Sequence, residues 1–293
     1  MRITPVWSMG RSRRLHVVVA GWDPERTTAT CRLIDATLVR NRVAVGRRVL
    51  VQNGARTGVQ TQDFTVIQGD NRGLDIGAMG QGVAHILESG AVARHDCLLI
   101  ANDMLPEYEE ERPVLRHVVP RLVRHIGSNR AIAGKVWPSK EAHELHGLPS
   151  RAWVQSHCFL LGVGLARQID LPALLTEAGE GTLAFDASGN IMTQGLVDPA
   201  FVDFITHGLV RWQPSRPNWQ WHRAEVWDPS HADQLSRKAV SILRERLVSA
   251  KVVAGGGYLL NVATMFSPGR WHWLPDGMTY LIRRMRGAGQ LRW

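Results

Sequence analysis

Short apolar runs alternate with segments of helical spacing through the first 165 residues of this chain. We interpret the apolar runs as strands; they occupy residues 15–22, 47–55, 63–69, 96–104, 130–137 and 153–162. Apolar residues recur at helical spacing in the intervening segments 27–39, 80–92 and 114–126. Strands that alternate with helices predict an α/β architecture with a mixed, mostly parallel sheet flanked by helices. In such a sheet, ligands bind beyond the carboxyl ends of the strands.

The alternation ends near residue 166, and the C-terminal part has a different composition. Residues 211–229 hold four tryptophans and three arginines, 232–252 form the clearest amphipathic helix, and 270–293 hold five arginines and three tryptophans. We therefore expect one main domain over residues 1–210 and a Trp/Arg-rich helical extension over residues 211–293.

Charge and cysteine content narrow the classes of partner and compartment. The formal net charge of +9 indicates an anionic partner such as a nucleotide, a nucleic acid or an acidic membrane surface. Three scattered cysteines form no disulfide or zinc pattern and predict buried thiols in a reducing compartment. The sequence has no apolar segment near the ~18–20 residues that span a bilayer. We expect a cytoplasmic protein, with the membrane's inner face as a further location.

Polar residues follow three of the predicted strands at the end where a ligand would lie. The stretches are "VQNGA" (51–55), "QGDNRGLDIGA" (68–78) and "IANDM" (100–104). The second belongs to a block, residues 67–83, with five glycines. Such a block indicates either a tight strand–helix turn or a backbone that a charged ligand approaches closely.

The order of these motifs resembles the GT-A glycosyltransferases, and most closely the rhamnan-synthesis type of bacterial polysaccharide glycosyltransferases. The resembling motifs are Asn71-Arg72-Gly73-Leu74-Asp75-Ile76-Gly77, Asn102-Asp103-Met104 and Gln155-Ser156-His157-Cys158-Phe159, within residues 15–165. The resemblance implies a GT-A-like, Rossmann-related fold, a nucleotide-diphosphate sugar donor, and a saccharide or lipid-linked saccharide acceptor. It departs at Ala101, where the family's fuller motif has a second aspartate.

A departing nucleoside diphosphate is an anion, and a divalent cation held by a carboxylate offsets its charge. We expect Asp103 to hold Mg²⁺ or Mn²⁺ and Asn102 to orient that carboxylate or a water, although the pair also suits a cap of the turn before Pro106. We expect Gly73 and Gly77 to admit the donor, Arg72 to pair with phosphate or with Asp75, and Asp75 to bind sugar or ribose hydroxyls. Asn71 belongs to the same donor-binding block.

Two further residues are expected near the nucleoside, and three are candidates for the catalytic base. Asn53 and Asp23 follow the second and first predicted strands; ordinary turn roles are the alternative for both. The base that deprotonates an acceptor hydroxyl should come downstream of the metal motif. Asp203 is the first candidate, followed by Asp186, and His207 is a candidate base or metal ligand. Surface or capping roles remain open for all three.

Three functional hypotheses follow, with glycosyl transfer in bacterial surface polysaccharide synthesis first. A non-catalytic nucleotide-sugar or glycan-binding protein of the same fold is second, because of Ala101 and because Thr206-His207 stand where the resemblance implies an acidic residue. A nucleic-acid-binding protein is third and disfavoured, because the basic residues are spread along the chain and form no recognition motif. The 211–229 segment suits sugar stacking or packing on the core. The 270–293 segment suits either a peripheral contact with an anionic membrane or a solvated basic end.

Overall fold

The structure is a computed structural model that describes residues 13–54, 59, 61, 63–108, 112–211 and 225–262 of the 293-residue chain. The strands are β1 (Leu15–Gly21), β2 (Val45–Gln52), β3 (Thr65–Gln68), β4 (Cys97–Asn102), β5 (Ala131–Leu145), β6 (Leu148–Gly162), β7 (Leu183–Phe185), β8 (Ile191–Thr193), β9 (Val210–Arg211), β10 (Glu225–Val226) and β11 (Tyr258–Asn261). The helices are α1 (Pro24–Arg40), α2 (Leu74–Glu88), α3 (Arg112–Arg116), α4 (Pro120–Ser128), α5 (Val163–Gln168), α6 (Leu171–Thr176), α7 (Pro199–Leu209) and α8 (Ala232–Ala254), with a short 3-10 turn η1 (Pro229–His231).

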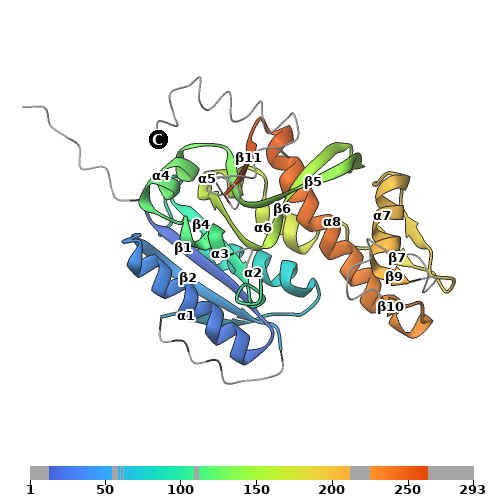
Figure 1. Cartoon of the computed structure of the whole chain (residues 1–293), viewed down its shortest axis with the longest axis horizontal. Helices are drawn as coiled ribbons and strands as arrows, with labels where there is room; N and C mark the ends of the chain where they lie inside the picture. The colour runs from blue at the N-terminus through green and yellow to red at the C-terminus, as the bar shows by residue number, and fades with distance from the viewer. Residues whose placement is uncertain are drawn as a thin grey trace, which may run out of the picture.

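A 7-stranded sheet in the order β11-β5-β6-β4-β1-β2-β3 forms the centre of the described part of the chain (Figure 1). The pairs β1–β2, β1–β4, β2–β3 and β5–β11 are parallel, whereas β6 runs antiparallel to both of its neighbours. The expected mixed, mostly parallel sheet flanked by helices is therefore confirmed. It places the chain in the Rossmann-like α/β class.

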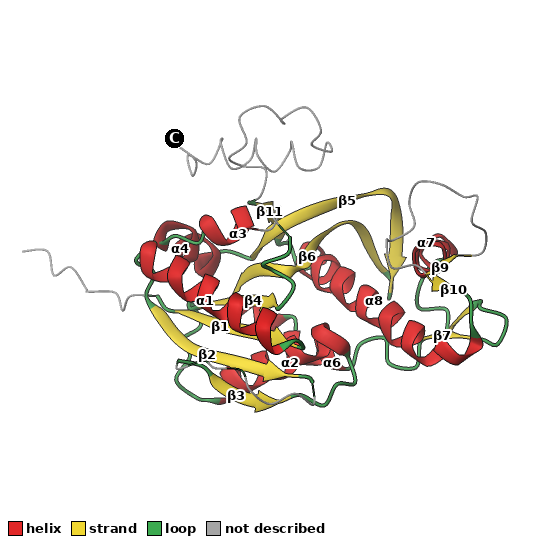
Figure 2. Ribbon diagram, turned by 60° about the horizontal axis from the view of Figure 1, so that its bottom comes forward, coloured by secondary structure: helices red, strands yellow, loops and turns green. Residues whose placement is uncertain are grey.

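Alternate residues of β1 enter two separate cores, one on each face of the sheet. Val17 and Val19 pack with α1, α3 and α4, whereas Val18 and Ala20 pack with α2, α6 and α8. Both cores form because successive side chains of a strand point to opposite faces. Figure 2 shows α1 and α8 on opposite sides of the sheet. All three cysteines are buried free thiols, and burial raises the pKa of Cys31 and Cys97 to about 12.

The segment expected to be a C-terminal extension contributes to both the sheet and its covering layer. β11 pairs in parallel with β5, and the buried face of α8 belongs to the core that also holds α2 and α6. Residues 212–224 and 263–293 lie outside the described residues, and with them most of the Trp/Arg segment and the whole basic tail. In the part of the chain that is described, no helix is both long and apolar enough to cross a membrane.

Two elements differ in extent from their prediction. The helix expected to begin at residue 80 begins at Leu74, so Gly77 lies inside α2 and not in a turn. β5 and β6 are each 15 residues long and form a hairpin through residues 138–152, a stretch that the apolar pattern leaves unassigned. His143 in that hairpin is 5% exposed because Phe201 and Phe204 of α7 cover it.

Candidate functional site

The carboxyl ends of β1, β2 and β4 meet at one edge of the sheet. Gly21 pairs with Gln52, and Ala20 pairs with Asn102, so the three strands end at nearly the same level. The loops that leave this edge carry the polar residues that the sequence singled out. This edge is where ligands bind in open α/β sheets.

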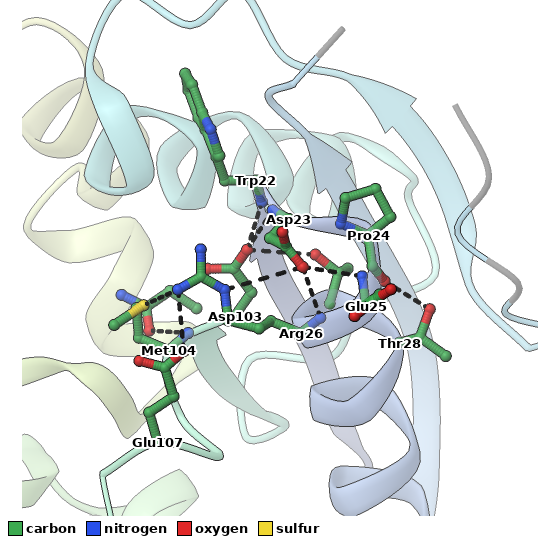
Figure 3. Close-up of polar contacts among 11 residues, drawn as sticks. Trp22, Asp23, Pro24, Glu25, Arg26, Thr28, Asp103, Met104 and Glu107 are labelled. Atoms are coloured by element: carbon green, nitrogen blue, oxygen red, sulfur yellow. Dashed lines mark hydrogen bonds and ion pairs between the residues drawn. The ribbon is translucent and has the colours of Figure 1, made fainter. Parts of the chain in front are cut away.

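Asp103 lies just beyond β4 and anchors the loop between β1 and α1 (Figure 3). Its Oδ2 accepts the backbone N–H groups of Trp22 and Asp23, each at 2.7 Å, and lies 3.4 Å from the Thr27 hydroxyl. The side chain is buried, at 5% exposure. Asp103 therefore fixes the shape of the loop that begins α1.

Asp23 and Arg26 complete this group of charges. Asp23 caps α1, because its Oδ1 accepts the N–H groups of Glu25 and Arg26 at 3.0 Å. Arg26 Nη1 lies 3.0 Å from Glu107 Oε1 and its Nε lies 4.0 Å from Asp23 Oδ1. The hydrogen bond with Glu107 raises the pKa of Arg26. The carboxylates of Asp23, Asp103 and Glu107 thus surround the guanidinium of Arg26, which leaves this group of four side chains with a negative net charge.

The fit of a divalent cation to this loop depends on Asp103. Within the described residues, no group of three or more histidine, cysteine, aspartate or glutamate side chains could hold a metal ion. Asp103 Oδ1 has no hydrogen bond in that same part of the chain, whereas Oδ2 is engaged. One free carboxylate oxygen suits Mg²⁺, which keeps several waters and takes further oxygens from phosphates. Asp103 as a single protein ligand therefore stays a prediction.

Asn102 and Asp75 join two of the motifs that lie apart in the sequence. Asn102 Nδ2 donates to Asp75 Oδ2 at 2.8 Å, and Asn102 Oδ1 accepts from the N–H of Met104 at 3.2 Å. Asp75 sits in the first turn of α2. The hydrogen bond brings the Asn-Arg-Gly block and the Asn-Asp-Met block together at the carboxyl edge of the sheet.

Asn53 connects the end of β2 to the same helix start. Its Nδ2 donates to the Leu74 carbonyl at 2.8 Å, while its buried Oδ1 has no partner. Asn71 and Leu74 have φ values of 60° and 54°, in the left-handed region that L residues rarely adopt. Such strain persists only where surrounding contacts impose it. Arg72 is exposed, and Asp75 pairs with Asn102 and not with Arg72.

The five glycines of residues 67–83 are required, or tolerated, for different structural reasons. A Cβ on Gly82 would lie 2.5 Å from Val18 Cγ1, and one on Gly80 would lie 2.7 Å from Thr176 Cγ2, so both allow α2 to pack closely. A Cβ on Gly69 would lie 2.0 Å from Asn53 Oδ1. The other two, Gly73 and Gly77, are the ones expected to admit a ligand. A Cβ on Gly73 would meet Arg244 Nη1 at 2.6 Å, and one on Gly77 would meet nothing within 4 Å.

β6 and α8 bring Ser156, His157 and Glu245 to this edge; the first two belong to the Gln155–Phe159 motif, and none of the three is among the predicted site residues. Ala101 pairs with Cys158, so His157 and Ser156 continue β6 beside Asn102 and Asp103. Glu245 of α8 accepts the N–H of Ser156 at 2.6 Å. Tyr108, from the loop after β4, stacks on His157 with ring centroids 4.1 Å apart.

Glu245 is the carboxylate at this edge that is best suited to accept a proton, because its pKa is raised. Burial raises the pKa of its carboxyl, and the hydrogen bond from Ser156 acts in the opposite direction. A signal was present in the sequence, because Arg244-Glu245-Arg246 interrupts the apolar stretch of α8 between Leu243 and Leu247. Arg244 and Arg246 are 2% and 1% exposed, although charged residues are rarely buried unless they are paired.

The three residues expected to supply the catalytic base lie elsewhere. Asp203 and His207 are on α7, with Asp203 exposed and His207 Nδ1 2.8 Å from the Asp203 carbonyl. Asp186 turns the β7–β8 hairpin by accepting the N–H groups of Ser188 and Asn190. In both views α7 and β7 lie beyond α8 from β1 and β2 (Figures 1 and 2). The structure therefore does not bring these side chains to the strand ends, because α7 packs against β5 and α8, β7 packs against α8, and Val197 before α7 pairs with Leu145 at the tip of the β5–β6 hairpin.

Comparisons with known proteins give little further information. No protein-family model matches the chain. No curated protein matches it either. Among solved structures it is similar to the crystal structure of 2-C-methyl-D-erythritol 4-phosphate cytidylyltransferase from Thermus thermophilus, with 14% identity and a TM-score of 0.32 over 80% of this chain and 98% of that one. A likeness of this size carries no information about activity.

Proposed function

We propose that this chain is a glycosyltransferase that moves a sugar from a nucleoside-diphosphate donor to a saccharide or lipid-linked saccharide acceptor in bacterial surface polysaccharide synthesis. The hydrogen bond between Asn102 and Asp75 carries the proposal. It joins the two resembling motifs at the edge of the sheet where such a donor would bind. Support also comes from the unpaired Asn53 Oδ1, a buried acceptor at the same edge.

The donor would lie across the loops that follow β1, β2 and β4. Asn53 and Asp23 would face the nucleoside, and Asp75 would accept hydrogen bonds from hydroxyl groups of the ribose or the sugar. Asp103 would hold Mg²⁺ or Mn²⁺ through Oδ1, and the cation would offset the charge of the departing diphosphate.

Glu245 would replace the three predicted residues as the catalytic base. Its carboxylate lies beside Ser156 and His157, level with the end of β4. A base works best when its pKa lies near the operating pH, and burial moves the pKa of Glu245 in that direction. If the reaction inverts the anomeric carbon, Glu245 would take the proton of the attacking acceptor hydroxyl.

A nucleoside-diphosphate release assay on the full chain tests the proposal. UDP-, GDP- and dTDP-sugars are supplied with saccharide acceptors, in Mg²⁺, in Mn²⁺ and in EDTA. Glu245→Gln should lower turnover by about 10²–10⁴-fold with donor affinity within a few-fold of wild type. Asp233→Asn, an exposed acid on the same helix, is the matched control.

The outcomes separate the hypotheses. Turnover that survives in Glu245→Gln but falls in Asp203→Asn would return the base to α7. Donor binding without turnover under every condition would favour the second candidate, a non-catalytic nucleotide-sugar or glycan-binding protein, which Ala101 in place of an acid already suggests. Peripheral contact of residues 270–293 with anionic membrane stays a separate prediction.

A further inference from the structure

Arg244 is a buried cation whose two amino groups lack a partner. The residue is 2% exposed, and its Nε donates to the Ala178 carbonyl at 2.7 Å. Within the described residues, neither Nη1 nor Nη2 has a hydrogen bond or an ion pair. The carboxylates of Glu180, Asp70 and Glu177 act on Arg244 only through space, and burial lowers its pKa. A guanidinium held in this way retains four N–H donors for a ligand.

The free end of Arg244 points at the start of α2. A Cβ on Gly73 would lie 2.6 Å from Arg244 Nη1, so the guanidinium occupies the space that a side chain would take. Gly73 is the N-cap of this 15-residue helix and provides no side-chain cap. The first N–H groups of a helix are unpaired and carry its positive dipole end. The carboxylate of Asp75 in the first turn is engaged by Asn102.

The guanidinium of Arg244 and the positive end of the α2 dipole therefore lie close together, and two positive groups at short range repel each other. The arrangement is favourable when an anion lies between them, since helix N-termini and arginine both bind phosphate. The space beside Gly77, one turn further along α2, is open to an added Cβ and would receive part of such an anion. Gly77 is buried, yet a Cβ on it would meet nothing within 4 Å.

We propose that Arg244, the N-terminus of α2 and the space beside Gly77 form an anion subsite that takes the diphosphate of a nucleoside-diphosphate ligand. The identity of that ligand as a sugar donor rests on the proposed function. The subsite itself requires only a pyrophosphate group. Arg244 would then be a binding residue supplied by α8, which lies far from the donor motifs in sequence.

Titration calorimetry with inorganic pyrophosphate in EDTA tests the subsite without any metal contribution. Wild type should bind pyrophosphate, and Arg244→Gln should weaken binding by at least about tenfold, roughly the strength of one charge-assisted hydrogen bond. Arg237→Gln, an exposed arginine on the same helix, should bind as wild type does. Wild type that binds no pyrophosphate, or folded Arg244→Gln that binds it unchanged, would overturn the proposal.

A second variant keeps the test decisive if Arg244→Gln does not fold. Gly77→Ser places a side chain in the open space and should weaken pyrophosphate binding with little change in melting temperature. Unchanged binding in folded Gly77→Ser would equally reject the subsite. Failure of the proposed function looks different: pyrophosphate binding would still depend on Arg244, but no nucleotide sugar would bind or turn over.

Discussion

Removing the Asp103 carboxylate should loosen the loop between β1 and α1 as well as weaken donor binding. Asp103→Ala deletes two hydrogen bonds of 2.7 Å to the N–H groups of Trp22 and Asp23. Hydrogen bonds to charged groups contribute about 1.5–3 kcal/mol each. Water can reach this loop, because the Trp22 residue is 48% exposed, so the total should be about 2–4 kcal/mol and not the full sum.

Asp103→Asn separates the structural role from metal binding. The amide oxygen can still accept both N–H groups, so the loss of unfolding free energy should be only about 1 kcal/mol. The loss of the negative charge should remove Mg²⁺- or Mn²⁺-dependent donor binding. Urea unfolding measures the first effect, and calorimetry of donor binding with metal and with EDTA measures the second.

The controls for Asp103 are an exposed acid and the metal itself. Asp203→Ala on α7 should change the unfolding free energy by no more than about 0.5 kcal/mol. If Asp103→Ala is as stable as wild type, the loop does not depend on this carboxylate. If folded Asp103→Asn keeps metal-dependent binding, Asp103 is not the metal ligand.

Three further predictions follow from packing and burial. Gly77→Ala should raise the unfolding free energy by about 0.5–1 kcal/mol, because alanine favours helices and its Cβ meets nothing within 4 Å, whereas Gly82→Ala should lower it by about 1–3 kcal/mol through its clash with Val18. Urea unfolding of both variants measures these changes, and equal effects of the two would contradict the packing. Burial lowers the pKa of His16 and His143, so near pH 6 the unfolded state binds more protons than the folded state. The unfolding free energy should therefore decline as pH falls below about 6.5 and be level above it, and equal values at pH 7.5 and 5.5 would contradict this. The guanidinium carbon of Arg246 lies 3.8 and 4.1 Å from the ring centroids of Trp153 and Phe204, so Arg246→Ala should lower the unfolding free energy by about 2–4 kcal/mol and Arg246→Met should restore most of it. Equal melting temperatures for the two variants would show that side-chain volume does not matter there.

The fold class and the edge that holds the site could be predicted from the sequence because both follow from local pattern. Continuous apolar runs identify strands buried on both faces, and their polar ends identify the carboxyl edge. The start of α2 was misplaced because its glycines favour a turn by propensity. Close packing of Gly80 and Gly82 on neighbouring elements overrides that propensity.

The missed part of the site lies on elements that tertiary packing alone brings to the edge. The register of β6 against β4 places His157 beside Asn102, and α8 then carries Arg244 and Glu245 to the same region. No local spacing links Arg244 and Glu245 to the motifs of the first half. Sequence order alone favours Asp186, Asp203 and His207 as base candidates, and sequence order carries no information about the packing on the β5–β6 hairpin and α8 that holds them away from the strand ends.

The most direct test of the donor site is hydrogen exchange of the full chain with and without a bound nucleotide sugar. The donor is first selected by thermal shift, where a ligand at 100 times its Kd adds about 2.7 kcal/mol of stability. Binding at the carboxyl edge should slow exchange in the segments 21–27, 69–77 and 102–108. It should leave α7 (Pro199–Leu209) unchanged. Protection confined to α7 and β7–β8, or no protection with any UDP-, GDP- or dTDP-sugar, would contradict the donor site.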